Sequence, residues 1–324
     1  MAEAAAVLGQ VVKLDRGFPL VKLEGGQLLR CEHATAVVKE NKMRATIGDF
    51  VEVAHANKND MGIISVIRPR KTKLVRKDPV DGTRIQVLAA NFNNIAVVHE
   101  LQSLNTRRLE RELVLAHASG AQVLVVLTKA DTAPSKAKAA KTVARVKLLV
   151  AAGVQVFATS TKTGEGINEL RRAMPPSTVT VLVGKSGAGK SSLINQLVGK
   201  NVQDTGNVRE GDGRGRHTTV SREMVAIPNA GFVVDMPGIR GLGLLGAEGG
   251  LYAAFADVYE LASGCKFRNC THKAEPGCAV RAAVGAGKLA PERLTSFQML
   301  AAEAKKHEKE LKDTGHMKRK RGSK

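Results

Sequence analysis

A segment in the middle of the chain has the residue types and the spacing that bind nucleotide phosphates. Residues 184–191 read G-K-S-G-A-G-K-S and match the pattern G-x-x-x-x-G-K-[S/T]. In such a loop the glycines let backbone N–H groups converge on phosphate oxygens, Lys190 reaches the β and γ phosphates, and the Ser191 hydroxyl ligates Mg²⁺. The predicted phosphate-binding residues are Gly184, Lys185, Ser186, Gly187, Ala188, Gly189, Lys190, Ser191 and Ser192.

Residues 128–131, which read T-K-A-D, precede the phosphate loop and could bind a guanine base. They resemble the N-K-x-D motif, in which the carboxylate accepts two hydrogen bonds from guanine N1–H and N2–H₂. Adenine offers no such pair of donors, so Asp131 would select guanine, and the stem of Lys129 would lie along the base. Thr128 stands where the motif has Asn, and we expect this change to loosen the tie between this loop and the phosphate loop.

Two further segments complete a nucleotide site of this kind. Backbone groups of Ser160, Thr161 and Lys162 could contact the guanine O6. Asp235 and Gly238 are similar to a D-x-x-G motif, in which the Asp holds Mg²⁺ through water and the Gly N–H senses the γ-phosphate.

The glycine-rich segment 206–219 lies between the phosphate loop and Asp235, and its composition indicates a mobile loop. Either Thr218 or Thr219 could close over Mg²⁺ in the nucleotide-bound state. The alternative is a flexible basic loop without a catalytic role. The predicted magnesium residues are Ser191, Thr218, Thr219 and Asp235.

Three thiols and one imidazole are clustered within fourteen residues near the C-terminal end. Three Cys and one His form a complete tetrahedral zinc set with no position open for water, which predicts one structural zinc ion. A module this small lacks a core of its own, so zinc would supply much of its folding energy. The alternative is reduced core cysteines with an incidental His. The predicted zinc ligands are Cys265, Cys270, His272 and Cys278.

The charge of the chain indicates a polyanionic partner. Fifty Lys and Arg against thirty Asp and Glu give a net charge of +20, which favours nucleic acid over a merely solvated basic surface. Aromatic residues make up only 3%, so RNA binding cannot rest mainly on base stacking. The clustered cysteines, and the lack of a signal peptide or a membrane-length apolar run, predict a cytoplasmic protein with no membrane partner.

The pattern of elements predicts a multi-domain α/β protein. Short strands separated by Gly and polar turns suit a small barrel over residues 1–75, an OB-fold or an SH3-like barrel that could bind RNA. Buried strands alternating with helices over residues 76–248 favour a parallel sheet covered on both faces. Residues 249–324 would form a zinc-binding helical module that ends in a disordered basic tail.

The order of the nucleotide motifs is unusual, because the base-binding segments come before the phosphate loop in the sequence. Circular permutation explains this order, since domain termini often lie close together and the chain can be cut elsewhere without loss of the site. The cut leaves the segment after Gly238 directly beside the nucleotide sensor.

These features together resemble the ribosome small subunit-dependent GTPase A family (RsgA, also called YjeQ or EngC) over nearly the whole chain. The most specific matches are residues 184–192, 213–219, 235–238 and the run 265–278, C-K-F-R-N-C-T-H-K-A-E-P-G-C. Residues 89–91 and 105–111 also resemble family segments. Thr128 departs from the family pattern, as does Asn93-Asn94 near a usual Asp.

The resemblance implies a GTPase that binds GTP and GDP, contacts the 30S subunit and its 16S rRNA through the barrel and zinc domains, and assists late subunit maturation. We expect a monomer with slow hydrolysis on its own, because Ile239 stands where many GTPases have a water-orienting Gln. His217 could orient that water once the subunit is bound, or could instead contact phosphate or rRNA. Two alternatives stay open: a GTP-dependent RNA-binding switch in which hydrolysis is incidental, and an ATPase acting on RNA.

Overall fold

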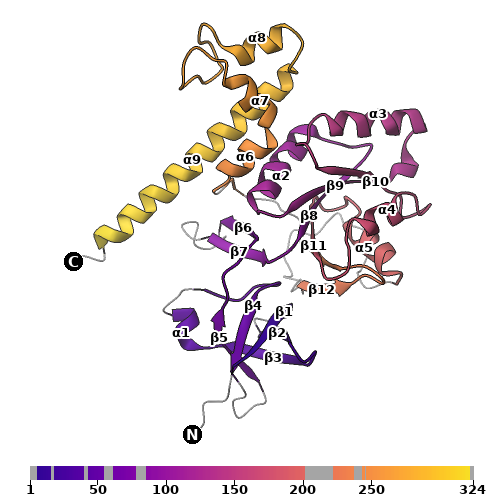
Figure 1. Cartoon of the computed structure of the whole chain (residues 1–324), viewed down its shortest axis with the longest axis vertical. Helices are drawn as coiled ribbons and strands as arrows, with labels where there is room; N and C mark the ends of the chain where they lie inside the picture. Colours follow the sequence, from indigo (N-terminus) through magenta and orange to yellow (C-terminus); the bar gives the residue numbers. More distant parts are fainter. Residues whose placement is uncertain are drawn as a thin grey trace, which may run out of the picture.

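The structure is a computed structural model of the 324-residue chain, and its parts follow one another along the long axis of the molecule (Figure 1). The N-terminal strands lie at one end of the view, an α/β sheet lies in the middle, and the last helices lie at the other end. The residues that the structure describes are 6–15, 18–39, 43–54, 61–77, 85–200, 222–236, 243–244 and 246–321.

Five short strands close into a barrel at the N-terminal end. They are β1 (Val7–Asp15), β2 (Phe18–Leu23), β3 (Leu28–His33), β4 (Phe50–Ala54) and β5 (Gly62–Ile67). Their order is β1-β2-β3-β5-β4, β4 pairs back to β1, and helix α1 (Thr35–Lys39) lies in the connection between β3 and β4. This Greek-key closure, with β3 and β5 parallel, confirms the OB-fold and excludes the SH3-like alternative.

Small apolar side chains fill this barrel. Val11, Val21, Val51 and Ile64 have no exposed surface, and each contributes about 1.5–3 kcal/mol by its burial. Cys31 is equally buried among them, and burial raises the pKa of its thiol to about 11. Cys31 is therefore a core side chain of the barrel and is separate from the other three cysteines.

The middle of the chain forms a six-stranded sheet with the order β10-β9-β8-β11-β13-β12. All neighbours are parallel except β12 and β13, which form a hairpin. The predicted strands are confirmed, but the prediction of a parallel sheet is wrong at β12, because the short turn from β12 to β13 permits only antiparallel pairing. The strands are β8 (Asn94–Glu100), β9 (Gln122–Thr128), β10 (Gln155–Ala158), β11 (Val179–Gly184), β12 (Arg222–Ala226) and β13 (Phe232–Asp235).

Helices cover both faces of this sheet, as predicted. Leu109 and Leu113 of α2 pack with Val97 of β8 on one face, whereas Leu193 of α5 packs with Val98 on the other. Alternate residues of a strand point to opposite faces, so a strand buried on both sides is apolar throughout. The helices are α2 (Thr106–Ala118), α3 (Lys136–Lys147), α4 (Ile167–Arg172) and α5 (Lys190–Val198).

Two connections between the barrel and the sheet were not predicted. A hairpin of β6 (Lys73–Lys77) and β7 (Ile85–Ala90) links them along the chain. In addition, β1 pairs antiparallel with β12, and Lys13 Nζ lies 2.6 Å from Glu223 Oε2 across that pair. The barrel and the sheet therefore share one continuous set of paired strands.

The C-terminal part is helical and consists of α6 (Glu248–Ala254), α7 (Ala256–Ala262), α8 (Ala279–Gly285) and α9 (Pro291–Arg321). Helix α9 has 31 residues and runs obliquely past the other three in Figure 1. It contains residues 318–321, so the expected disordered tail is wrong for these residues. Within the described part of the chain, none of the helices is long and apolar enough to cross a membrane.

A buried arginine joins this helical module to the α/β sheet. Arg293 of α9 is 6% exposed and donates to Glu110 of α2 and to Asp257 of α7, both at 2.8 Å. Its guanidinium also lies 4.1 Å from the ring centroid of Phe255. Leaving one charge of such a buried group unpaired costs several kcal/mol, so the module is held in place against α2.

Candidate nucleotide site and metal cluster

The predicted nucleotide segments meet at one edge of the sheet. The phosphate loop follows β11, Asp131 follows β9, Ser160 follows β10, and Asp235 ends β13. All four strands run in the same direction within the sheet, so their carboxyl ends lie at one edge. Ligands of open α/β sheets bind at this edge.

The phosphate loop has a backbone that only glycine suits at its two ends. Gly184 has a φ of 154°, and a Cβ there would lie 2.3 Å from the Val98 carbonyl oxygen. Gly189, with a φ of 86°, is the residue that caps the N-terminus of α5. The loop therefore approaches β8 closely and points the first N–H groups of a helix into the site, which suits an anion.

Lys190 lies inside this loop. Its ammonium donates to the carbonyl oxygens of Gly184 and Lys185 at 3.2 and 3.3 Å. Burial lowers the pKa of Lys190, while the charges of Asp235 and Glu112 favour its protonated form. The loop thus holds a buried cation, and its contact with phosphate oxygens stays a prediction.

Asp235 lies next to the start of α5. Burial raises the pKa of its carboxyl, whereas the charge of Lys190 and a hydrogen bond from Ser191 act in the opposite direction. Its Oδ1 is buried and has no hydrogen-bond partner among the described residues. A buried carboxylate oxygen beside a serine hydroxyl fits a hard divalent cation such as Mg²⁺. The other residues predicted to act here, His217, Thr218, Thr219 and Gly238, lie outside the described residues.

The two predicted base-binding loops form one hydrogen-bonded unit. The Ser160 hydroxyl donates to Asp131 Oδ1 at 2.6 Å and accepts from the backbone N–H groups of Lys162 and Thr163. Ser160 is fully buried, whereas Asp131 is exposed to the site. The side chain of Ser160 therefore orients the Asp131 carboxylate, which we predict to select guanine; from the sequence, only the backbone of Ser160 was expected to act.

Lys129 and Thr161 complete these loops. Lys129 has a left-handed backbone, with a φ of 55°, and its Nζ lies 3.2 Å from Glu100 Oε2 at the end of β8. The lysine stem thus lies along the edge of the sheet with its charge compensated. Thr161 is half-buried between Ser160 and the exposed Lys162.

Thr128 ties the base-binding loop to the phosphate loop. Its hydroxyl lies 2.7 Å from the carbonyl oxygen of Ala188 and 3.2 Å from that of His99. A hydroxyl has one proton to donate, and the shorter distance assigns it to Ala188. The buried threonine therefore links the two loops directly, and the expected loosening relative to Asn stays a prediction.

A buried acidic side chain on α2 was not predicted from the sequence. Glu112 of α2 accepts from Arg108 at 2.8 Å and lies 2.7 Å from His99 Nε2. Glu112 is 3% exposed, and its charge favours the protonated form of Lys190. The Asn105 side chain caps this helix by accepting from the Arg108 N–H. The sequence of α2 alone does not indicate that Glu112 is buried, because an acidic residue on a helix is usually exposed.

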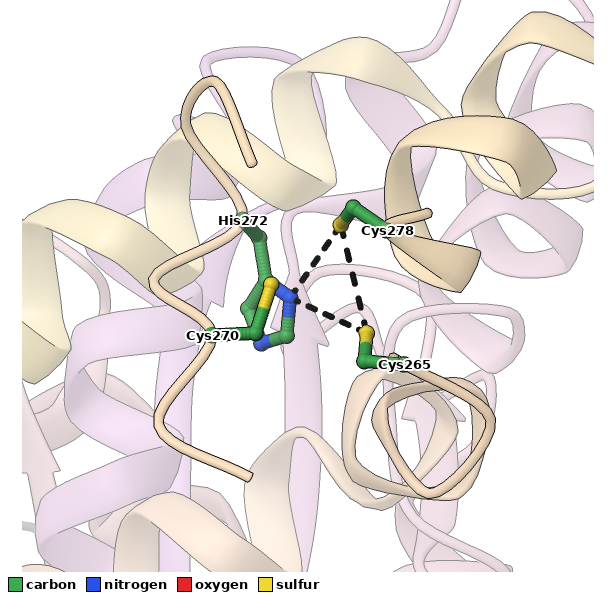
Figure 2. A group of neighbouring side chains, drawn as sticks. All are labelled: Cys265, Cys270, His272 and Cys278. Atoms are coloured by element: carbon green, nitrogen blue, oxygen red, sulfur yellow. Dashed lines mark hydrogen bonds between the residues drawn. The ribbon is translucent and has the colours of Figure 1, made fainter. Parts of the chain in front are cut away.

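The three cysteines and the histidine converge at the C-terminal module (Figure 2). The Sγ atoms of Cys265 and Cys278 lie 4.0 Å apart, and His272 Nδ1 lies 3.6 and 3.4 Å from them. A tetrahedral zinc ion with Zn–S bonds of about 2.3 Å requires ligand separations of about 3.5–3.8 Å. The arrangement, which includes Cys270, therefore fits the predicted zinc site.

The surrounding structure holds these ligands in place. Cys278 caps the N-terminus of α8, since its sulfur accepts from the Arg281 N–H at 3.5 Å. His272 has a left-handed backbone, with a φ of 59°, and its carbonyl oxygen accepts from Gln298 of α9 at 2.7 Å. The cluster thus connects the loop before α8 to α9, which is the role of a structural metal.

The sheet order and the site define a phosphate-loop GTPase that is circularly permuted, because β9 and β10 precede β11 in the chain. The family model described as RsgA GTPase matches residues 67–245. A curated relative from Streptomyces coelicolor, the small ribosomal subunit biogenesis GTPase RsgA, is 40% identical over 91% of this chain and 80% of its own. A protein of the same name from Methanosarcina acetivorans is 38% identical over 79% and 69%.

Solved structures agree on the fold. YjeQ from Thermotoga maritima has a TM-score of 0.68 at 24% identity, covering 92% of this chain and 98% of its own. YloQ, described as a circularly permuted GTPase, has a TM-score of 0.65 at 23% identity, with coverages of 94% and 97%. The chain belongs to the RsgA GTPase family, and it is an enzyme that hydrolyses GTP to GDP and phosphate.

Replacement of Thr128 tests the tie between the two loops. In Thr128→Val the Ala188 carbonyl loses its donor, so we expect affinity for GDP to fall about tenfold. Thr128→Ser, which keeps the hydroxyl, should bind nearly as well as the original protein. Titration with a fluorescent GDP analogue measures both variants. Equal affinities for the Val and Ser variants, with unchanged melting temperatures, would show that the hydrogen bond does not position the site.

Metal analysis tests the cluster. We expect one zinc ion per purified chain, lost in Cys265→Ala together with a marked drop in the stability of the C-terminal module, because metal binding supplies folding energy. Cys31→Ala, in the barrel core, is the matched control and should retain one zinc. Elemental analysis and thermal unfolding measure both effects. Full zinc content in Cys265→Ala would contradict the assignment.

Proposed function

We propose that this protein acts in biogenesis of the small ribosomal subunit, where it binds the 30S particle and hydrolyses GTP in response to it. The observation that carries the proposal is the similarity to curated small ribosomal subunit biogenesis GTPases, at 40% identity over 91% of the chain. The net charge of +20 supports a ribosomal RNA partner, since neutralised phosphates release counterions.

In this proposal the barrel (residues 1–75) and the zinc module (residues 249–324) contact 16S rRNA, while the domain between them (residues 76–248) works on GTP. Their position at the two ends of the molecule supports contacts at separate places on the subunit. The protein acts as a monomer in the cytoplasm.

The nucleotide occupies the shared edge of the sheet. The backbone of residues 184–192 holds the phosphates, Lys190 lies against the β and γ phosphates, and Asp131, oriented by Ser160, accepts from guanine. Ser191 and Asp235, with Thr218 or Thr219, hold Mg²⁺. When bound, Mg²⁺ neutralises charge that develops on the phosphate oxygens.

Helix α2 supports a route by which the subunit could influence the nucleotide site. Its outer residue Glu110 is buried against Arg293 of the zinc module, and Arg111 donates to Glu303 of α9 at 2.7 Å. Its inner residue Glu112 contributes to the charge around Lys190. A force on the zinc module would therefore act on the helix that carries Glu112, which lies 2.7 Å from His99 Nε2 on β8.

The subunit is needed because the chain lacks its own water-orienting residue after the D-x-x-G segment. Ile239 stands there and has no polar group. His217, in the glycine-rich segment, is proposed to orient the attacking water when the subunit is bound.

The test is GTP turnover measured alone, with purified 30S subunits and with purified 50S subunits. We expect slow turnover alone and a rise of at least about tenfold with 30S but not with 50S, since a partner that completes a GTPase site raises its rate by orders of magnitude. Equal rates under all three conditions would overturn the proposal.

Two variants sharpen this experiment. Lys190→Ala should lose activity in every condition, which shows that the turnover belongs to this site and not to a contaminant. His217→Ala should bind GTP normally and lose most of the 30S stimulation. Unchanged stimulated turnover in His217→Ala would leave the subunit dependence standing but remove His217 from the catalytic role.

A further inference from the structure

The zinc module carries an open cleft lined by aromatic rings. It lies between α6, α7, α9 and the loop that holds Cys270 and His272, and its volume is about 690 Å³. Tyr252 is 61% exposed and Phe267 is 41% exposed at this cleft. Five of the ten Phe and Tyr residues lie in this module: Tyr252, Phe255, Tyr259, Phe267 and Phe297.

The rings are held by one another. Tyr252 and Tyr259 have ring centroids 5.0 Å apart, and Tyr259 meets Phe297 edge-on at 5.4 Å. Phe297 in turn packs against Phe255, which is fully buried beneath Arg293. The exposed Tyr252 ring is therefore the outer end of a packed aromatic row. Because its side chain is already held by Tyr259, it would lose little conformational entropy when a ligand stacks on it.

The cleft is lined by small apolar side chains on one part of its surface and by positively charged side chains on another. Ala301 and Ala302 of α9 line it with small side chains, which leaves room for a flat group beside the rings. Arg268, Lys273 and Lys305 line it with positive charge, against the single carboxylate of Glu248. Flat apolar walls beside a cationic rim suit a group that joins an aromatic plane to a phosphate.

We propose that this cleft binds an unpaired base of single-stranded RNA, stacked on Tyr252 or Phe267, with the neighbouring phosphates at Arg268, Lys273 and Lys305. The inference rests on the proposed ribosomal function and names a contact within it. A base in a duplex is stacked inside the helix and cannot enter a cleft, whereas an unpaired base can. An apolar peptide would use the rings but has no need of three cations on the rim.

The two tyrosines provide a direct readout. The chain has no Trp and only two Tyr, both of which line this cleft, so the intrinsic fluorescence of the protein comes from Tyr252 and Tyr259 alone. RNA bound at the barrel is therefore silent in this measurement. We expect an adenylate RNA hexamer to quench the fluorescence, and an abasic hexamer or a stable G·C-rich RNA duplex to leave it unchanged.

Variants separate stacking from charge. Tyr252→Leu, monitored through Tyr259, should weaken hexamer binding about tenfold, whereas Tyr252→Phe should not, because base stacking needs only the ring. Lys305→Gln should weaken binding and reduce its salt dependence. Lys141→Gln, an exposed lysine on α3, removes the same charge elsewhere and should leave hexamer binding unchanged.

The cleft is not a base site if the hexamer fails to quench the fluorescence, if the abasic hexamer or the duplex quenches as strongly, or if Tyr252→Leu binds the hexamer as well as Tyr252→Phe. These outcomes are independent of the 30S-stimulated GTPase assay, so failure here leaves the proposed function intact. Conversely, quenching by the hexamer would stand even if turnover did not respond to 30S subunits.

Discussion

The structure depends on the parallel pairing of β11 at the centre of the sheet. Residues Thr180 to Gly184 of β11 pair with β8 on one side, and Val179 to Leu182 pair with β13 on the other. Strands that run together end together, so this pairing delivers the phosphate loop, Asp235 and the base-binding loops to one edge. The site is a consequence of strand direction and does not depend on the order of the segments in the chain, which is why a permuted sequence can build it.

Two hydrogen bonds connect the loops at this edge to one another. The Thr128 hydroxyl joins the end of β9 to the phosphate loop, and Ser160 joins β10 to Asp131. On α2, the buried Glu112 lies 2.7 Å from His99 Nε2, and the buried Glu110 accepts from Arg293 of α9. Helix α2 therefore contacts the zinc module through Glu110 and, through Glu112, the side chain of His99, whose carbonyl oxygen lies 3.2 Å from the Thr128 hydroxyl.

The elements and the motifs could be predicted because their signals are local. Alternating apolar strands, the glycines of the phosphate loop and the spacing of Cys265 to Cys278 are all visible within short windows of sequence. The pairing of β1 with β12 could not be predicted, because it joins residues about two hundred positions apart and leaves no periodic pattern. The inward orientation of Glu112 and the hydroxyl tie of Thr128 were missed for the same reason, since each depends on a partner from a distant segment. The end of α9 was misjudged because a run of basic residues is compatible both with a disordered tail and with the last turns of a helix.

We propose that this edge of the sheet selects guanine through Asp131. The most direct measurement is the relative affinity of the protein and its Asp131→Asn variant for GTP, XTP and ATP, with Glu165→Gln as a neighbouring control. We expect the original protein and the control to prefer GTP. Asp131→Asn should lose about a hundredfold in GTP affinity, because no carboxylate accepts from guanine, and should gain affinity for XTP, because an amide can donate to the xanthine oxygen. An unchanged preference for GTP in Asp131→Asn would contradict it.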